Sequence, residues 1–430
     1  MSFKLTITPF EHQQKYIQFA LACDYTLCGD EMGLGKTLSA IGVACAMKAR
    51  TLVVCPAFLK HNWKAEFLKF TDLKESEILV INSKKDFEKS NGVKIVVINY
   101  EKLKDCERLF QWADYVIADE AHYLKNIEAK RTQYFHQFIK LHRPERLSLL
   151  SGTAVKNRVE EFYSLLVLMA YVPSNGRNGL KITDKYRVQY KFSKQFSHER
   201  VFDIAVRGRK VTVRKFEGLK NEAELKTYFR GKYMRRLTSQ VIDLPELLER
   251  YVEVNYKFDD KELENYAKYT NKMDGHVMAI KKGSAVAKAS FTADYAKNIF
   301  DETGNPVVIF SDHIEPVHNI ADKLKNSAYI TGATPMEERH TIVSSFQAGK
   351  LDYIVATIGA ASTGITLTRS NNLVFNDMSY IPADNAQASK RIHRIGQENN
   401  CRIHKICGST VDKAIMTSLT SKQQVLDKIL

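Results

Sequence analysis

Two short segments carry side chains whose types and spacing suit phosphate chemistry. The first is residues 29–37, where Gly29, Gly33 and Gly35 precede Lys36 and Thr37. Glycines let backbone N–H groups approach phosphate oxygens, and the start of a following helix adds partial positive charge. Lys36 would then pair the β- and γ-phosphates of a nucleotide, and the Thr37 hydroxyl would hold Mg²⁺. An ordinary glycine-rich turn is the alternative.

The second segment is the tetrad at residues 119–122, which contains two acidic residues and follows an apolar run. Residues 115–118 predict a buried strand, which ends in Asp119 and Glu120. Carboxylates suit the carboxyl edge of a parallel sheet, where ligands bind. Asp119 would reach Mg²⁺ through water, and Glu120 would orient and deprotonate the attacking water, because phosphoryl transfer depends on positioning and charge neutralisation. Without the glycine-rich loop, the tetrad would be read as a solvated helix start.

A third segment near the end of the chain is basic. If residues 387–397 form a helix, Gln387, Arg391 and Arg394 share one face at i, i+4 and i+7. Two guanidiniums on one face can point together at a phosphate and stabilise charge in a transition state. A basic helix face that is simply solvated is the alternative.

Apolar runs alternate with helical patterns in two blocks of the chain, and these runs must position the segments above. The first block predicts strands at 51–55, 78–81, 94–99, 115–118 and 147–150. The second predicts strands at 307–310, 328–330, 353–356, 373–375 and 402–406. Strand and helix in alternation indicate parallel α/β sheets. We therefore expect an α/β fold with two parallel-sheet lobes, helical insertions and a β-hairpin.

The division of the chain follows from these blocks. We expect a first lobe at 1–172, an insertion region with a linking brace at 173–250, and a second lobe at 251–430. Within the insertion, two alternating runs flank Arg207, Gly208, Arg209 and Lys210, which predicts a hairpin at about 200–216 with a cationic tip. Our hypothesis is that this hairpin acts as a wedge and separates the strands of a nucleic-acid fork. A solvated basic turn is the alternative.

The composition of the chain indicates which kind of binding partner to expect. The chain has 430 residues and a formal net charge of +15, so its surface should attract a polyanion. Nucleic acid is the first candidate, and a merely basic enzyme is the alternative. Neither a signal peptide nor a membrane-spanning run is expected, and the odd number of scattered cysteines suits reduced thiols in a cytoplasm without a structural metal.

The motifs in order resemble the superfamily-two helicases of the Swi/Snf family, with its two RecA-like lobes. The resemblance rests on DEMGLGKT at 30–37, DEAH at 119–122, SGT at 151–153 and QASKRIHRIGQ at 387–397. The sequence at residues 359–364 departs from the family's usual motif and is more similar to that of the annealing and fork-remodelling helicases, a branch of the family. The small size resembles compact versions in bacteria and bacteriophages, including a phage branch-migration helicase, which implies a bacterial or phage-infected cytoplasm.

The resemblance also implies roles for individual residues. For ATP with Mg²⁺, it implies catalytic Lys36, Asp119, Glu120 and two arginine fingers, Arg391 and Arg394. It implies nucleotide contacts at Gln13, Gly33, Gly35, Lys36, Thr37, Leu38 and Gly364, with the metal at Thr37 and Asp119. It implies DNA contacts at Lys60, Asn62, Trp63, Asn99, Tyr100, Lys156, Asn157, Ser311 and Thr357, to which the hairpin adds Arg207, Arg209 and Lys210. For Trp63, a position in the core is the alternative.

These implications together predict a monomeric, DNA-dependent ATPase that walks along double-stranded DNA and remodels branched or forked DNA. Phosphate contacts should dominate, because movement over arbitrary sequence excludes strong base readout. Two alternatives stay open: a motor that displaces proteins from DNA or acts on RNA, and an ATP-gated clamp that does not move.

Overall fold

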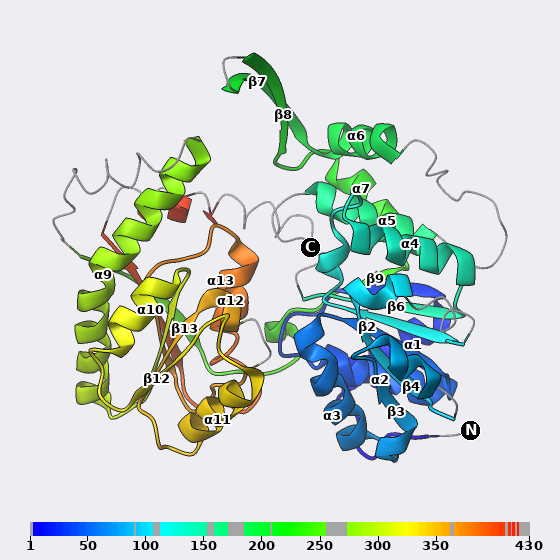
Figure 1. Ribbon diagram of the computed structural model, residues 1–430, viewed down its shortest axis with the longest axis horizontal. Coiled ribbons are helices and arrows are strands. Elements are labelled where there is room, and N and C mark those ends of the chain that lie inside the picture. Colours follow the sequence, from blue (N-terminus) through cyan, green and yellow to red (C-terminus); the bar gives the residue numbers. More distant parts are fainter. Residues whose placement is uncertain are drawn as a thin grey trace. The chain divides into compact units, whose positions relative to one another are not determined.

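The described residues form two compact units, one within Met1–Val241 and the other within Ile242–Gln424. Both units are drawn in Figure 1. In this computed structural model, the described residues are 3–89, 92–105, 112–152, 159–170, 185–206, 209–254, 273–361, 365–408, 412–413, 415–417 and 419–420. No helix in this described part is long and apolar enough to cross a membrane.

The first unit is built on a seven-stranded sheet with the order β3-β4-β2-β5-β6-β1-β9, in which every pair of neighbours is parallel. Its strands are β1 (Tyr25–Cys28), β2 (Thr51–Cys55), β3 (Ile78–Val80), β4 (Ile95–Asn99), β5 (Tyr115–Asp119), β6 (Arg146–Leu150) and β9 (Tyr233–Met234). Its helices are α1 (Glu11–Ala22), α2 (Lys36–Met47), α3 (Lys60–Phe70), α4 (Lys130–His142), α5 (Phe162–Ala170), α6 (Lys185–Phe196) and α7 (Glu222–Phe229).

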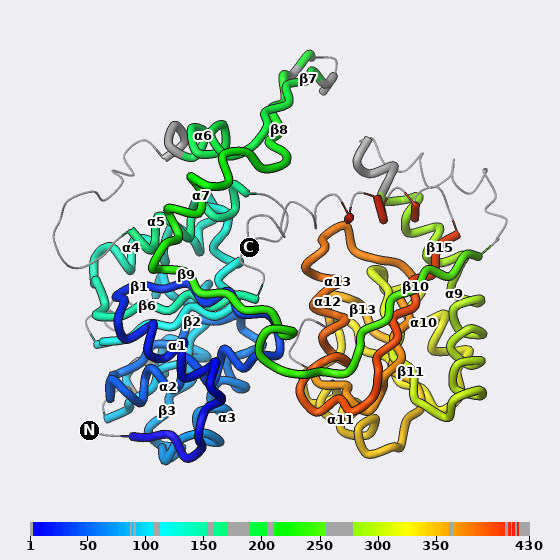
Figure 2. Tube along the Cα trace, turned by 180° about the vertical axis from the view of Figure 1, so that it is seen from behind, coloured from blue at the N-terminus to red at the C-terminus, as the bar shows by residue number. Residues whose placement is uncertain are grey.

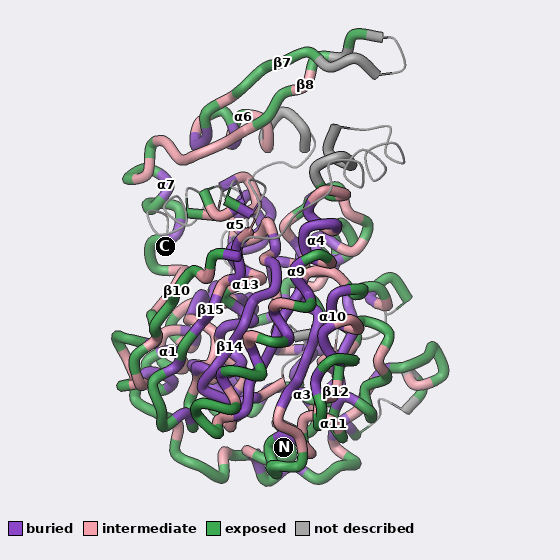
Figure 3. Tube along the Cα trace, turned by 90° about the vertical axis from the view of Figure 1, so that its left-hand side faces the viewer, coloured by how far each residue is buried: buried purple, intermediate pink, exposed green. Residues whose placement is uncertain are grey.

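Alternate residues of each central strand point to opposite faces of this sheet, so both faces are apolar. Val53 and Val97 pack with Trp63 and Phe67 of α3 and with residues of α1 and α2. Residues next to them in the strands, such as Val54, pack instead with α4 and α5. Figure 3 shows which parts of the chain are buried and which are exposed.

The second unit contains a six-stranded sheet with the order β10-β15-β14-β11-β13-β12, again wholly parallel. Its strands are β10 (Leu247–Glu253), β11 (Val307–Ser311), β12 (Ser327–Ile330), β13 (Tyr353–Thr357), β14 (Asn372–Phe375) and β15 (Cys401–Cys407). Its helices are α9 (Met273–Thr303), α10 (Ile314–Ala321), α11 (Met336–Gln347), α12 (Ile358–Ala361) and α13 (Pro382–Ser389). Helices α9 and α10 cover one face, and α11 and α13 cover the other.

The expected fold class is confirmed. All ten predicted strands are present, and the two sheets are parallel as the alternation of strands and helices predicted. The predicted hairpin is also present, as β7 (His198–Val206) paired antiparallel with β8 (Arg209–Glu217). It extends from the first unit beyond α6 and α7 (Figure 1). Strands β1, β9 and β10 were not anticipated, and β9 lies beside β1 at the sheet edge (Figure 2).

Candidate phosphate site and neighbouring surfaces

The loop between β1 and α2 has the backbone of a phosphate cradle. Gly33 and Gly35 have φ angles of 92° and 74°, in the left-handed region that favours glycine. Lys36 begins α2, and its Nζ donates to the backbone carbonyls of Asp30 (2.8 Å) and Glu31 (3.3 Å). The ammonium is therefore held inside the loop, and a bound phosphate would offer it stronger acceptors than these carbonyls.

Helix α1 supports the loop from one side. Gln13 is buried, its Nε2 donates to the carbonyl of Leu34 (3.3 Å), and its Oε1 accepts from the backbone N–H of Phe10 (2.9 Å). A Cβ at Gly35 would lie 2.3 Å from the Gln13 Nε2 and would displace that side chain, and the φ of 74° also favours glycine there. Gln13 thus positions the loop, which is a role that the sequence did not indicate. Thr37 is half-buried and Leu38 is buried in the first turn of α2.

The acidic pair lies at the carboxyl end of β5, two strands from β1 in the sheet order. Burial of the Asp119 carboxyl group, together with the charge of Glu120, raises the pKa of Asp119 to about 7. The Trp63 indole opposes this rise by donating to Asp119 Oδ2 (2.8 Å). Glu120 itself has a φ of 50°, which is unusual for a residue with a side chain.

Strand β6 lies between β5 and β1, and the residues that follow it also belong to the candidate site. His122 Nδ1 contacts both Glu120 Oε2 (3.1 Å) and Ser151 Oγ (3.3 Å), so it joins the acidic pair to the end of β6. At Gly152, a Cβ would lie 3.0 Å from the Lys36 Nζ. The lysine, the carboxylates and the first residues of the SGT segment therefore meet at one sheet edge.

An ion pair that the sequence did not indicate holds Asp30 of the loop. Asp30 is buried, and its Oδ1 accepts from the Arg236 Nε (3.0 Å) while its Oδ2 pairs with the Nη2. The Arg236 Nη1 also donates to the backbone carbonyl of His12. Beside it, Glu31 Oε2 accepts from the Thr238 N–H (2.7 Å). Residues that follow β9 therefore brace the loop, and Arg236 also ties it to α1 through His12.

Three residues that the resemblance assigned to DNA are directed inward, which does not suit direct DNA contact. Trp63 and Tyr100 are each 1% exposed, and the Tyr100 hydroxyl donates to the backbone carbonyl of Asp119 (2.8 Å). Lys60 is also buried, where its Nζ donates to the carbonyl of Ile81 (2.8 Å). The alternative that Trp63 belongs to the core is the one that the structure supports.

The remaining assigned residues of the first unit differ in accessibility. Asn62 is exposed on α3, whereas Asn99 is buried and donates to Glu101 Oε2 (2.8 Å). Lys210 is exposed on β8 and pairs with Asp203 (2.9 Å). Arg209 begins β8. Lys156, Asn157 and Arg207 lie outside the described residues, as does Gly364 of the second unit.

Two residues of the second unit that the resemblance assigned to DNA contacts lie at the edge of its sheet, where their hydroxyl groups form hydrogen bonds within the unit. Ser311 ends β11, is fully buried and donates to Asp377 Oδ1. Thr357 ends β13, is buried, and its Oγ1 accepts from the Ala360 N–H (3.3 Å). Both hydroxyls therefore serve local structure.

The expected helical face of Gln387, Arg391 and Arg394 is wrong. Helix α13 ends at Ser389, so only Gln387 lies on it and both arginines follow in turns. The helix stops because the chain turns back: the Arg391 carbonyl accepts from the Leu367 N–H (2.9 Å). Arg391 is buried, while the half-buried Arg394 donates to the Thr366 Oγ1 (3.0 Å). The turn still places both guanidiniums beside the segment 365–366.

The donor set of the first unit fits a divalent cation. The Thr37 hydroxyl and the Asp119 carboxylate are hard oxygen ligands of the kind that Mg²⁺ prefers. Burial and the charge of Glu120 raise the pKa of Asp119, so the charged form of its carboxyl group is disfavoured here, and a bound cation would favour that form. Among the described residues, no separate group of three or more His, Cys, Asp and Glu side chains suits a metal ion.

A phosphate loop, an acidic pair and a parallel sheet, with a second parallel-sheet lobe, define a class of two-lobed nucleotide-using proteins. The SNF2-related domain model matches residues 12–301, and the helicase conserved C-terminal domain model matches residues 292–396. The first match spans more than half of the chain. The chain therefore belongs to the SNF2-related family.

Individual relatives agree with this assignment. The mouse "DNA annealing helicase and endonuclease ZRANB3" is 29% identical over 457 residues, which cover 99% of this chain and 41% of the relative. A Caenorhabditis elegans "SWI/SNF-related matrix-associated actin-dependent regulator of chromatin subfamily A-like protein 1 homolog" is 29% identical over 450 residues, covering 98% of this chain and 61% of the relative. The chain thus spans less than two thirds of these relatives' lengths.

Among solved structures, the "Sulfolobus solfataricus SWI2/SNF2 ATPase core in complex with dsDNA" matches with 22% identity and a TM-score of 0.46, covering 100% of this chain and 94% of that chain.

Proposed function

We propose that this chain is an ATP-dependent DNA translocase that remodels branched or forked DNA by DNA-stimulated ATP hydrolysis. The observation that carries the proposal is the meeting of Lys36, the Asp119–Glu120 pair and the start of the SGT segment at one sheet edge. Membership in the SNF2-related family supports DNA as the partner. The +15 charge of the chain and the name of the relatives, DNA annealing helicase and endonuclease ZRANB3, support it as well.

In the proposed reaction, the loop N–H groups and Lys36 bind the ATP phosphates, and Thr37 with Asp119 holds Mg²⁺. The ion, when bound, neutralises charge that develops on the phosphates. Glu120 orients the attacking water and accepts its proton. Arg391 and Arg394 are proposed to stabilise the transferring phosphate, as the motif resemblance implies.

The network around His122 supports coupling between hydrolysis and DNA. Glu120 and Ser151 share the Nδ1 of His122. Ser151 and Gly152 begin the SGT segment, which resembles the family's motif that couples the ATP and DNA sites. We propose that a change at Glu120 reaches this segment through the His122 imidazole. We also propose a revised role for Trp63 and Tyr100: they hold Asp119 in place rather than bind DNA.

The decisive experiment measures ATPase rate against single-stranded, duplex, forked and four-way DNA, with the Glu120→Gln variant as the inactive control. We expect strong stimulation by duplex and branched DNA. Displacement of a triplex-forming strand from duplex DNA should also require ATP hydrolysis. DNA-stimulated hydrolysis without triplex displacement would identify a clamp and overturn translocation. Absence of stimulation by every DNA would overturn the proposed function as a whole.

A further inference from the structure

The hairpin of β7 and β8 has two chemically different faces. In an antiparallel pair, residues directly opposite each other share a face, and successive pairs alternate between faces. Val201 is opposite Arg214, whereas the next residue, Phe202, is opposite Val213. Each of these two pairs therefore marks one face, which we name the anchored face (Val201, Arg214) and the Phe202 face (Phe202, Val213).

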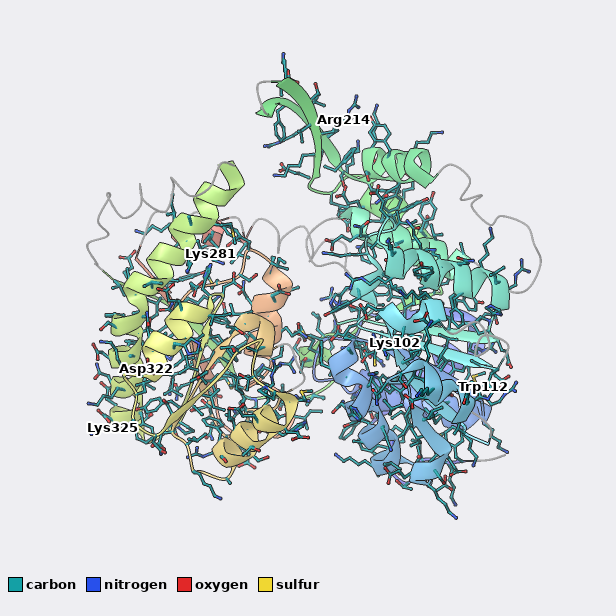
Figure 4. All side chains as sticks on the ribbon, in the orientation of Figure 1. Lys102, Trp112, Arg214, Lys281, Asp322 and Lys325 are labelled. Carbon is teal, nitrogen blue, oxygen red and sulfur yellow. The ribbon has the colours of Figure 1, made fainter. Side chains whose placement is uncertain are left out.

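The anchored face is occupied by contacts within the first unit. Arg214 donates to Glu199 Oε1 (2.9 Å) and to the hydroxyl of Tyr190 on α6 (2.7 Å). Its position beside α6 is shown in Figure 4. Further along the same face, Asp203 pairs with Lys210 (2.9 Å). The charges of this face are therefore neutralised in pairs, and its base is tied to a helix.

The Phe202 face presents an aromatic ring beside cations. Phe202 is 44% exposed, although burial of a side chain of this size is strongly favourable. The adjacent pair on the same face is Arg200 and Lys215, whose side chains are 74% and 44% exposed. Both cations contact a single carboxylate, Glu217, at 3.3 Å and 2.7 Å. This face is thus apolar at one pair and carries net positive charge at the next.

The charge of the hairpin favours a polyanion over an apolar protein surface as the occupant. Residues 198–217 contain six Lys and Arg against three Asp and Glu. An exposed aromatic ring beside cations matches the two needs of single-stranded nucleic acid, which are stacking for bases and positive charge for phosphates. A duplex satisfies only the second need, because its bases are already stacked inside the helix.

We propose that the Phe202 face binds unpaired nucleotides of a strand that leaves the duplex. Phe202 stacks on a base, and Arg200 with Lys215 contacts the neighbouring phosphates. This proposal rests on the proposed function, because a motor at a fork generates the unpaired strand. It differs from a wedge made by the cationic tip, because the base-binding group lies on one face of the ribbon.

The test compares variants of adjacent residues on opposite faces. Phe202→Ala removes the ring, and the matched control Val201→Ala changes a 57% exposed residue on the anchored face. The probe is a fluorescein-labelled 20-nucleotide oligo(dT), bound without ATP and followed by anisotropy. Stacking energies predict roughly 10-fold weaker binding for Phe202→Ala, near-normal binding for Phe202→Trp and little change for Val201→Ala.

A second measurement uses forked DNA with 2-aminopurine in the unpaired arm next to the junction. Stacking on Phe202 should quench its emission in the wild type and in Phe202→Trp, but not in Phe202→Ala. Duplex-stimulated ATPase should be equal in all four proteins, while fork unwinding should fall in Phe202→Ala alone.

Several outcomes would overturn the proposal. Wild-type affinity of Phe202→Ala for oligo(dT) would show that bases bind elsewhere, and full rescue by Phe202→Leu would show apolar packing instead of stacking. A change of oligomeric state in Phe202→Ala at unaltered oligo(dT) affinity would identify a protein partner. These outcomes are distinguishable from failure of the proposed function, which would appear as absent DNA-stimulated ATPase in the wild type.

Discussion

The two parallel sheets present opposite electrostatic situations at their carboxyl edges. Asp119 ends β5 in the first unit, and burial with the neighbouring Glu120 raises its pKa to about 7. Asp377 follows β14 in the second unit, where burial alone would raise its pKa, but a hydrogen bond and charge from His313 bring the pKa below its ordinary value. The His313 Nδ1 lies 3.0 Å from Asp377 Oδ2.

This difference shows which edge is built for a ligand. The Lys36 ammonium donates to two backbone carbonyls, and the carboxylates beside it repel each other, so a nucleotide with a cation would suit both groups. At the second edge, Ser311 and His313 already satisfy Asp377. We therefore expect a ligand to bind at the first edge, whereas the polar groups named at the second edge already pair with one another.

The largest expected effect comes from breaking the first edge. Lys36→Ala should abolish turnover by removing a phosphate ligand, and Glu120→Gln should abolish it while ATP still binds, since water positioning is lost. Steady-state ATPase and nucleotide binding by fluorescence titration separate the two effects. Ser311→Ala, at the second edge, is the control and should hydrolyse ATP normally. Near-normal hydrolysis in either first-edge variant would refute the site.

A somewhat smaller effect is expected from the arginines of the second unit. Arg391→Ala and Arg394→Ala should each lower kcat by roughly 10³-fold with a modest loss of ATP affinity, because such guanidiniums act mainly on the transition state. Comparison of kcat with KM for ATP checks this. If DNA affinity alone fell, both residues would contact the DNA backbone instead, and the second unit would contribute nothing to hydrolysis.

The third prediction concerns the ion pair between Asp30 of the phosphate loop and Arg236. Arg236→Ala leaves Asp30 as a buried, unpaired charge, which should lower the free energy of unfolding of the first unit by about 3 kcal/mol. Urea denaturation measures this effect, and Asp30→Asn combined with Arg236→Ala should recover part of it. Equal stability of Arg236→Ala and the wild type would mean that the ion pair is not a structural element of the loop.

The smallest effect concerns a histidine of the second unit. His404 is buried and accepts a hydrogen bond from the Arg250 Nε (2.8 Å). Burial, with the charges of Arg250 and Arg402, lowers its pKa to about 4. Because the unfolded side chain titrates near 6.5, the unfolded state binds more protons between these values, so stability falls as pH drops through this window.

His404→Gln should remove this dependence. Between pH 7.5 and pH 5, the wild type should lose about 2 kcal/mol more stability than the variant, as measured by urea denaturation at both values. Parallel losses in the two proteins would assign the acid sensitivity to other groups.

The strands and the phosphate loop could be predicted because their signals are local. Apolar runs such as residues 51–55 mark buried strands, and the glycine spacing before Lys36 marks the loop. The end of α13 at Ser389 could not be predicted, because it depends on the bond between Arg391 and Leu367. Likewise, Asp30 and its partner Arg236 are 206 residues apart, so no local pattern connects them.

The placement of Trp63 illustrates a second limit. An indole near the start of a helix can serve DNA or a core, and only the tertiary contact with Asp119 decides between them. The two strands at sheet edges, β9 and β10, had no signal of their own either. β9 has two residues and β10 is mostly exposed, so neither shows the continuous apolar run of a central strand.

The position of β9 has a practical consequence for expressing the first unit alone. A fragment that stops at residue 172 contains the phosphate loop and the acidic pair, yet it lacks β9, which pairs with β1 through Tyr233 and Met234. Its sheet would end in an unprotected β1, the kind of open edge that recruits other chains and aggregates. A soluble fragment should therefore extend to Val241, where the compact unit ends.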